Sequence, residues 1–318
     1  MGWFDPTWLT ALEPRALPQQ VVNGLLIGSI YALIALSFSI TFTTTRTLNF
    51  AQGEFVSFGA FVGVSVLLAL TGTATIGAMP LDAGGGVNYP VALLAAAVVS
   101  GVVGILVFLL AVRPFAGKPG MSWVMSTIGF GILLQSAGLA VWGPATAKLP
   151  GPLADDVIRI AGAGVRPQEL LVLAATALIL VGYELAMNRS RLGKATKAVA
   201  HSPEVASLMG INVPVVMMGA FAVSSALAGL AGVLIAPIAT ASLYMGLAFA
   251  LKAFAGAIVG GLDSPRGCIY GGFILGVIES FVGLWHSQLR EIAVFLLIIL
   301  VLAVRPAGLF GARSLVKV

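Results

Sequence analysis

The chain has 318 residues, of which 59% are hydrophobic and 9% are charged, and its mean hydropathy is +1.04. Soluble domains carry roughly 25% charged residues, so this composition excludes a water-soluble enzyme and indicates a membrane protein. The net charge is +5, but the Lys and Arg residues are spread thinly along the chain. They therefore indicate membrane topology, and no nucleic-acid partner is expected.

The apolar residues form stretches of the length that crosses a bilayer. A span needs about 20 mainly apolar residues to cross about 30 Å of hydrocarbon. Nine stretches come close to this length: residues 20–42, 50–70, 89–112, 121–142, 169–187, 212–236, 244–261, 267–285 and 289–304. The last three are short and closely spaced, so one of them is a candidate re-entrant helix, and eight to ten spans are predicted with nine the best fit. The expected fold class is all-α, a polytopic transmembrane helix bundle that forms one domain over residues 1–318.

The first 19 residues and the loop cations predict how the chain is oriented. The first 19 residues contain neither a basic segment before an apolar run nor a small-residue cleavage site, so no cleaved signal peptide is expected. Lys and Arg in short loops are retained on the cytoplasmic side. With the N-terminus outside, the inner loops contain Arg46, Arg113, Lys118, Arg189, Arg191, Lys194, Lys197, Arg266, Arg305, Arg313 and Lys317. The outer side then contains Arg15, Lys148, Arg159, Arg166 and Arg290. The inner excess predicts an N-terminus outside and a C-terminus in the cytoplasm.

Glu54 opens the second predicted span, where an acid in a first helical turn is favoured by the helix dipole. It is either a helix-capping residue or part of a polar pathway through the membrane. The sequence leaves both interpretations open.

The long outer loop, residues 143–168, contains a hairpin signal. Two short β-favouring segments, 157–160 and 165–167, flank the Gly-containing stretch 161–164. This predicts a small β-hairpin. It is either a docking surface for an external partner or an ordered loop without one.

The longest inner loop, residues 188–211, contains a predicted amphipathic helix. Ser202 is the expected N-cap, Pro203 occupies the first helical position, Glu204 lies in the first turn and Gly210 follows the helix. Its apolar stripe, at the i, i+3 and i+4 positions, consists of Val205, Leu208 and Met209. Such a helix either lies on the membrane surface or inserts into a groove of another protein.

Two further ionisable residues lie inside predicted spans. Lys252 is at the middle of span 244–261, too far from either end for its side chain to reach water. A charge at mid-membrane costs about 2.5–3.5 kcal/mol on insertion scales, so Lys252 requires a partner or a cavity. Glu279 in span 267–285 is a possible partner. Both residues are candidates either for a structural ion pair or for the lining of a translocation path.

Small residues spaced four apart predict close helix packing in several spans. The pairs are Gly59 and Gly63, Ser225 and Gly229, Ala228 and Gly232, and Gly272 and Gly276. This signal concerns packing alone, because channels, transporters and intramembrane enzymes share it.

No sequence pattern supports a metal, a cofactor or a catalytic residue in this chain. His201 and His286 have no further ligands at suitable spacing, and Cys268 is the single cysteine. The phosphate-binding Gly-x-x-x-x-Gly-Lys-[Ser/Thr] loop is missing too, so any ATP must be hydrolysed by another subunit.

Blocks of residues along almost the whole chain resemble the branched-chain amino acid ABC-transporter permeases of the LivH type. The N-terminal blocks are Asn23-Gly24, Gly28–Ala35 and Leu48–Glu54. The inner loop Gly193–Asn212 is similar to the loop of that family that contacts the ATPase. The C-terminal blocks are Leu251–Phe254, Ile258–Gly267 and Val304–Gly311. Two departures stand out: Gln52 replaces a common His and cannot titrate, and Lys197 replaces a common Arg and loses its bidentate fork.

The resemblance implies an importer permease fold in the inner membrane, with a second homologous permease subunit, two cytoplasmic ATP-binding subunits and an extracytoplasmic substrate-binding protein. ATP and Mg²⁺ would bind only to the partner subunits. The residues expected to couple the chain to the ATPase are Lys194, Lys197, Ser202, Glu204, Val205, Leu208 and Met209. The candidate translocation path comprises Asn49, Gln52, Glu54, Lys252 and Glu279.

The function expected is import of branched-chain amino acids or related small polar solutes. Permeases of the same family also serve urea and short amides, so the solute stays open. The alternative from another class is a stand-alone secondary carrier or channel, which would need coupling-ion carboxylates at mid-membrane.

Overall fold

A computed structural model describes residues 16–72, 85, 87–115, 122–153, 157–160, 163–285 and 289–311 of the chain. Within these residues each of the nine predicted spans coincides with a helix. The helices are α1 (Ala16–Thr45), α2 (Gln52–Thr71), α3 (Asn88–Val107), α4 (Ser122–Trp142), α5 (Pro167–Arg189), α8 (Val213–Ile235), α9 (Met245–Gly260), α10 (Pro265–Trp285) and α11 (Leu289–Val304). A π-helical turn (Phe108–Val112) and a 3₁₀ turn (Arg113–Phe115) extend α3. The chain is therefore a polytopic helical bundle, as predicted.

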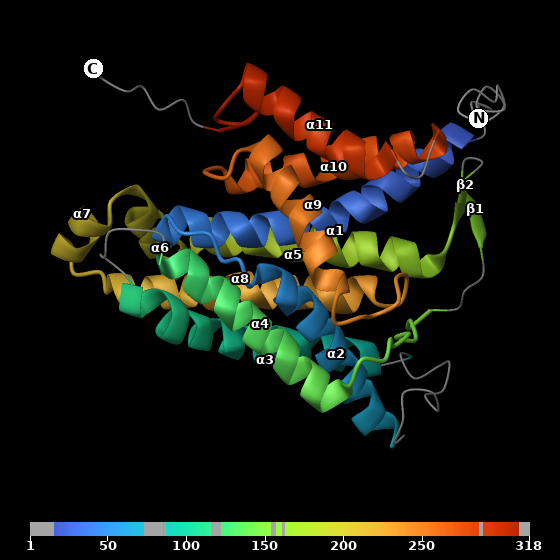
Figure 1. Ribbon diagram of the computed structural model, residues 1–318, viewed down its shortest axis with the longest axis horizontal. Helices are drawn as coiled ribbons and strands as arrows, with labels where there is room; N and C mark the ends of the chain where they lie inside the picture. Colours follow the sequence, from blue (N-terminus) through green and yellow to red (C-terminus); the bar gives the residue numbers. More distant parts are fainter. Residues whose placement is uncertain are drawn as a thin grey trace.

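Seven of the helices in the described ranges are long and apolar enough to cross a membrane. The helices α9 and α11 have 16 residues each, which corresponds to about 24 Å. Both belong to the group of short spans that the sequence singled out. The helix α9 crosses α1 in the middle of the bundle (Figure 1) and contacts α1, α2 and α10.

Glycine allows α2 and α8 to cross in backbone contact. A Cβ atom added to Gly59 would lie 2.3 Å from the Cα atom of Gly229, and one added to Gly232 would lie 1.9 Å from the carbonyl oxygen of Val56. Real Cβ atoms never approach backbone so closely, so neither position admits a larger residue without a shift of a helix. This confirms the packing role predicted for the small pairs in these two spans.

The same arrangement joins α1 to α10, the helix pair with the most extensive contact. A Cβ atom added to Gly272 would lie 2.5 Å from the nitrogen of Ala32, and one added to Gly276 would lie 2.3 Å from the Cα atom of Gly28. The bundle core therefore consists of α1, α2, α8, α9 and α10, and α3 packs on it against α8 and α2. Few residues of α4, α5 and α11 are buried, as expected of helices that face lipid.

The predicted hairpin and the predicted loop helix lie at opposite ends of the bundle (Figure 1). Strands β1 (Ile158–Ile160) and β2 (Ala163–Val165) pair antiparallel, with Ile158 opposite Val165. The second strand begins earlier than predicted, because Ala163 and Gly164 of the expected turn 161–164 belong to β2 and Pro167 already begins α5; residues 161 and 162 lie outside the described residues. The Gly164 nitrogen donates a hydrogen bond to Oε1 of Gln19, 2.7 Å away, which holds the hairpin against α1. At the other end lie α6 (Arg191–His201) and α7 (Pro203–Leu208).

Candidate functional site

The helix α2 begins inside the bundle, and not at its end. The Gln52 Nε2 atom donates hydrogen bonds to Oγ of Ser37 on α1 (2.8 Å) and to the carbonyl oxygen of Ser224 on α8 (3.1 Å). Ser37 is about 12 Å from the end of α1, and Ser224 is about 17 Å from the start of α8, at 1.5 Å per residue. The N-terminus of α2 therefore lies roughly half-way across the bundle.

Asn49 and Gln52 are completely buried and hold this N-terminus in place. The Asn49 Nδ2 atom donates to Oε1 of Gln52 at 3.1 Å, and the Ala51 nitrogen donates to Oδ1 of Asn49 at 3.1 Å. The Ser224 hydroxyl donates to the Ser37 carbonyl oxygen, 2.8 Å away. Their amides therefore join α1, α2 and α8 and are not themselves open to a cavity. Asn49 and Gln52 remain candidates for the translocation path, as residues that position the backbone beside it.

Glu54 is half-buried in the first turn of α2, beside α4. Its Cγ atom lies 3.5 Å from the Cβ position of Gly131, near the middle of α4. Among the described residues its carboxylate has no hydrogen-bond or ion-pair partner. A free carboxylate at this depth does not simply cap a helix at the membrane surface, which favours the path interpretation over the capping one.

The start of α9 packs directly on the start of α2. The Gly246 nitrogen donates to Oγ of Ser57 at 2.8 Å, and a Cβ added to Gly246 would lie 2.0 Å from the Gly53 carbonyl oxygen. Three large apolar side chains beside this contact are exposed: Phe50, Leu247 and Leu251. Sequence reasoning did not single out these residues, because an exposed apolar residue in a span has the same local pattern as a buried one.

Lys252 and Glu279 form an ion pair that links α9 to α10. The Lys252 ammonium donates to Oε1 of Glu279 at 2.5 Å, and the Tyr31 hydroxyl of α1 donates to Oε2 at 2.8 Å. The Lys252 side chain is 23% exposed and that of Glu279 is 7% exposed. The structure therefore brings together the two ionisable residues whose contact was left open, and it adds a tyrosine that no sequence signal indicated.

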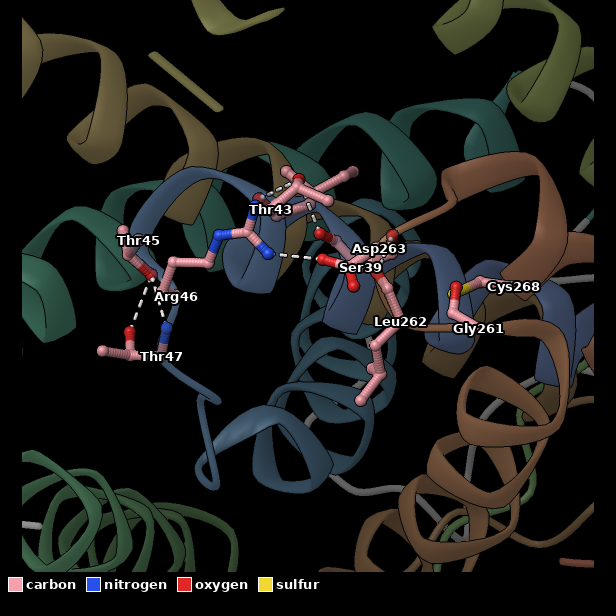
Figure 2. A network of polar contacts seen from close by, with 10 residues as sticks. Ser39, Thr43, Thr45, Arg46, Thr47, Gly261, Leu262, Asp263 and Cys268 are labelled. Carbon is pink, nitrogen blue, oxygen red and sulfur yellow. Dashed lines mark hydrogen bonds and ion pairs between the residues drawn. The ribbon is translucent and has the colours of Figure 1, made fainter. Parts of the chain in front are cut away.

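A polar cluster ties the end of α1 to the turn between α9 and α10 (Figure 2). The Arg46 guanidinium pairs with Asp263, and the Ser39 hydroxyl donates to the Leu262 carbonyl oxygen at 2.9 Å. Arg46 has a positive φ of 55°, the left-handed conformation that commonly ends a helix. The residues after α11 pack against the same end of α9, where the nitrogen of Leu309 donates a hydrogen bond to the Val259 carbonyl oxygen at 2.8 Å.

The loop of residues 188–211, which we term the coupling loop, contains the predicted helix α7. Ser202 is its N-cap and accepts a hydrogen bond from the Val205 nitrogen at 3.3 Å, and Gly210 follows with a positive φ of 80°. The stripe residues are highly exposed: Val205 at 57%, Leu208 at 86% and Met209 at 78%. Glu204 is exposed too. Among the residues that the structure describes, this apolar surface has no partner, so it is available to a membrane or to another protein.

Sequence reasoning missed the second helix of the coupling loop, α6, which carries Lys194 and Lys197. Ser190 caps it by accepting a hydrogen bond from the Gly193 nitrogen at 2.9 Å. That serine, followed by a stretch rich in Ala, Lys and Arg, was the signal available. Both lysines are exposed, so α6 and α7 together present cations and apolar side chains at one end of the bundle.

The chain is similar over nearly its full length to known permease components. Residues 20–304 match the family described as branched-chain amino acid transport system, permease component. The chain is 31% identical to the high-affinity branched-chain amino acid transport system permease protein BraD of Pseudomonas aeruginosa, over 94% of this chain and 97% of BraD. It is 30% identical to LivH of Salmonella typhimurium, over 94% and 97%. It is 25% identical to a probable LivH of Methanocaldococcus jannaschii, over 92% of each chain.

Proposed function

Since the chain belongs to the family of branched-chain amino acid transport system permease components, we propose that it is a transmembrane subunit of an ABC importer. It moves branched-chain amino acids or related small polar solutes into the cytoplasm and has no catalytic site of its own. A second homologous permease completes the membrane part, two cytoplasmic subunits bind and hydrolyse ATP with Mg²⁺, and an extracytoplasmic protein delivers the solute. The chain lies in the inner membrane with its N-terminus outside.

The observation that carries the proposal is the exposed apolar stripe of α7 at the end opposite the hairpin. A protruding helix with three exposed apolar residues fits the helix-in-groove mode of protein recognition. Lys194 on α6 and Glu204 on α7 are exposed charges at the same end of the bundle that can orient a partner. Closure of the ATP-binding subunits on ATP would move α7, and this movement biases the bundle because ATP binding has different affinity for its two states.

The solute path follows the buried start of α2. A helix N-terminus at mid-membrane carries partial positive charge, which suits the carboxylate of an amino acid. Asn49 and Gln52 hold that N-terminus, and Glu54 is the free acid beside it. The exposed Phe50, Leu247 and Leu251 face the second permease subunit, so the path runs between the two subunits. Lys252 and Glu279 fix α9 beside it.

Reconstitution tests whether the chain depends on ATP-binding partners. Liposomes that contain this chain, its second permease and its ATP-binding subunits, with the binding protein outside, are expected to take up radiolabelled leucine, isoleucine or valine only when ATP is enclosed. Parallel uptake of urea and a short amide defines the solute. Uptake by this chain alone, driven by an ion gradient, would show a stand-alone carrier and contradict the proposal.

Replacing Leu208 with alanine is expected to uncouple the transporter without unfolding it, because the side chain is 86% exposed and contributes nothing to the core. Loss of an interface anchor costs about 1 kcal/mol or more, so stimulation of ATP hydrolysis by the solute-loaded binding protein should fall about fivefold or more. Leu178→Ala, which truncates an exposed apolar residue of α5 away from both the coupling loop and the hairpin, is the control. Equal stimulation in both variants would remove α7 from the coupling mechanism.

A further inference from the structure

A cavity of about 710 Å³ lies beside the coupling loop, at the same end of the bundle. The last turns of α5 and the first turns of α10 form its sides, α1 contributes Ile40 and Thr43, and α6 lines its end. We term it the α5–α10 groove. Its lining residues are Ile40, Thr43, Tyr183, Glu184, Met187, Asn188, Thr196, Lys197, Ala200, His201, Asp263, Ser264, Pro265, Arg266, Ile269 and Phe310.

Much of this lining is apolar, and it continues into a surface that faces lipid. Leu178, Val181 and Leu185 on α5 are all exposed, and α5 is long and apolar enough to span the membrane. Tyr270 of α10 lies against the Phe310 ring with centroids 5.4 Å apart, and both side chains are about half exposed. Aromatic side chains of this kind are typical of the membrane–water interface. The groove is therefore placed where a lipid headgroup region meets the hydrocarbon.

The acids of the groove are neutralised by arginines. Glu184 pairs with Arg266 across the groove, from α5 to α10. Asp263 pairs with Arg46. Neither carboxylate is therefore an uncompensated charge that would repel an anion.

Lys197 is a cation of the groove lining that takes part in neither of these ion pairs. Its ammonium donates to Oδ1 of Asn188 at 2.6 Å, a neutral partner, and it forms no ion pair with any described residue. His201 lies one helical turn further along α6 and lines the groove too. The groove thus combines an uncompensated ammonium at its cytoplasmic end with apolar walls that open towards lipid.

We propose that the α5–α10 groove binds an anionic phospholipid of the cytoplasmic leaflet, with its phosphate at Lys197 and an acyl chain against Ile40, Met187 and Ile269. Basic pockets between helices on the cytoplasmic side are suited to such headgroups. The assignment to this leaflet rests on the orientation in the proposed function. A lipid bound there contacts α5, α6 and α10, so it stabilises the position of the coupling loop against the bundle.

Native mass spectrometry of the full chain in detergent tests this proposal. Phosphatidylglycerol and phosphatidylcholine with identical acyl chains are added separately to the wild type and to two variants. Because one cation near a headgroup contributes about fivefold in affinity, the wild type should prefer phosphatidylglycerol about fivefold. Lys197→Gln should lose that preference. Lys194→Gln, which removes the same charge from the same helix outside the groove, should keep it.

Two further arms separate the possible ligands and the possible failures. Soluble glycerol 3-phosphate should not displace the lipid, because it lacks the acyl chain. Equal retention of both lipids by the wild type, equal losses in the two lysine variants, or displacement by glycerol 3-phosphate would each overturn the proposal. Lipid retention requires no partner subunit and no uptake, so a negative uptake experiment and a negative lipid experiment remain distinguishable.

Discussion

Alanine at Gly232 is expected to destabilise the permease by about 3 kcal/mol, at the upper end of the usual cost of overpacking. The new Cβ atom would lie 1.9 Å from the Val56 carbonyl oxygen and 3.0 Å from the Ala60 nitrogen. Because both are backbone atoms, relief requires α2 and α8 to separate. Val56 is one turn after Gln52, so the separation also displaces the N-terminus of α2. The measurement is the melting temperature of the purified protein in detergent, together with solute uptake.

Gly219 is the matched control for this prediction. It lies on the same helix, α8, and nothing lies within 4 Å of its Cβ position. Gly219→Ala should leave stability unchanged or raise it by up to about 1 kcal/mol, the gain in helix propensity. If the two variants shift the melting temperature equally, backbone contact between α2 and α8 is not what holds them together.

Removing Lys252 alone is expected to harm the protein more than removing both members of its ion pair. Lys252→Met leaves Glu279 buried with the Tyr31 hydroxyl as its remaining partner, which costs about 3 kcal/mol for an uncompensated buried charge. The double variant, Lys252→Met with Glu279→Gln, retains an acceptor for Tyr31 without a charge and should recover most of that loss. A double-mutant cycle on melting temperatures measures the coupling between the two residues.

The pair between Arg266 and Glu184 supplies the comparison, because its side chains are 66% and 41% exposed. Arg266→Met should cost no more than about 1 kcal/mol, as for other exposed ion pairs. A loss as large as that of Lys252→Met would mean that burial does not set the cost. Uptake by the stable double variant then distinguishes the two roles of Lys252: normal uptake indicates an ion pair that only supports α9, and loss of uptake indicates contact with the solute.

The elements predicted well were those whose signal is local. Each apolar stretch became a helix, because a backbone without water must satisfy its hydrogen bonds within the segment. The hairpin and α7 followed from their turn and cap residues, among them Ser202, Pro203 and Gly210. The helix α7 and its apolar stripe were therefore predicted, although the neighbouring helix α6 was not.

The candidate path was predicted less well, because depth in a membrane is not a local property. Hydropathy places Glu54 in the first turn of a span, but the contacts of Gln52 with Ser37 and Ser224 place that turn half-way across the bundle. Phe50, Leu247 and Leu251 have no distinguishing pattern, because their exposure depends on where α2 and α9 meet. Likewise Lys252 required a partner, but its identity depended on how α9 and α10 pack.

Composition and span length determined that this chain is a bundle of membrane-spanning helices, because each residue contributes to these quantities whatever its distant neighbours are. Loop charge in the same way predicts the orientation of the bundle. The blocks of residues that resemble the permease family determined the kind of transporter. Only the tertiary structure decided that α2 starts at mid-depth, that Lys252 pairs with Glu279 and Tyr31, and that a groove forms between α5 and α10. These features depend on contacts between residues far apart in the chain, which glycine-to-glycine helix crossings bring within reach.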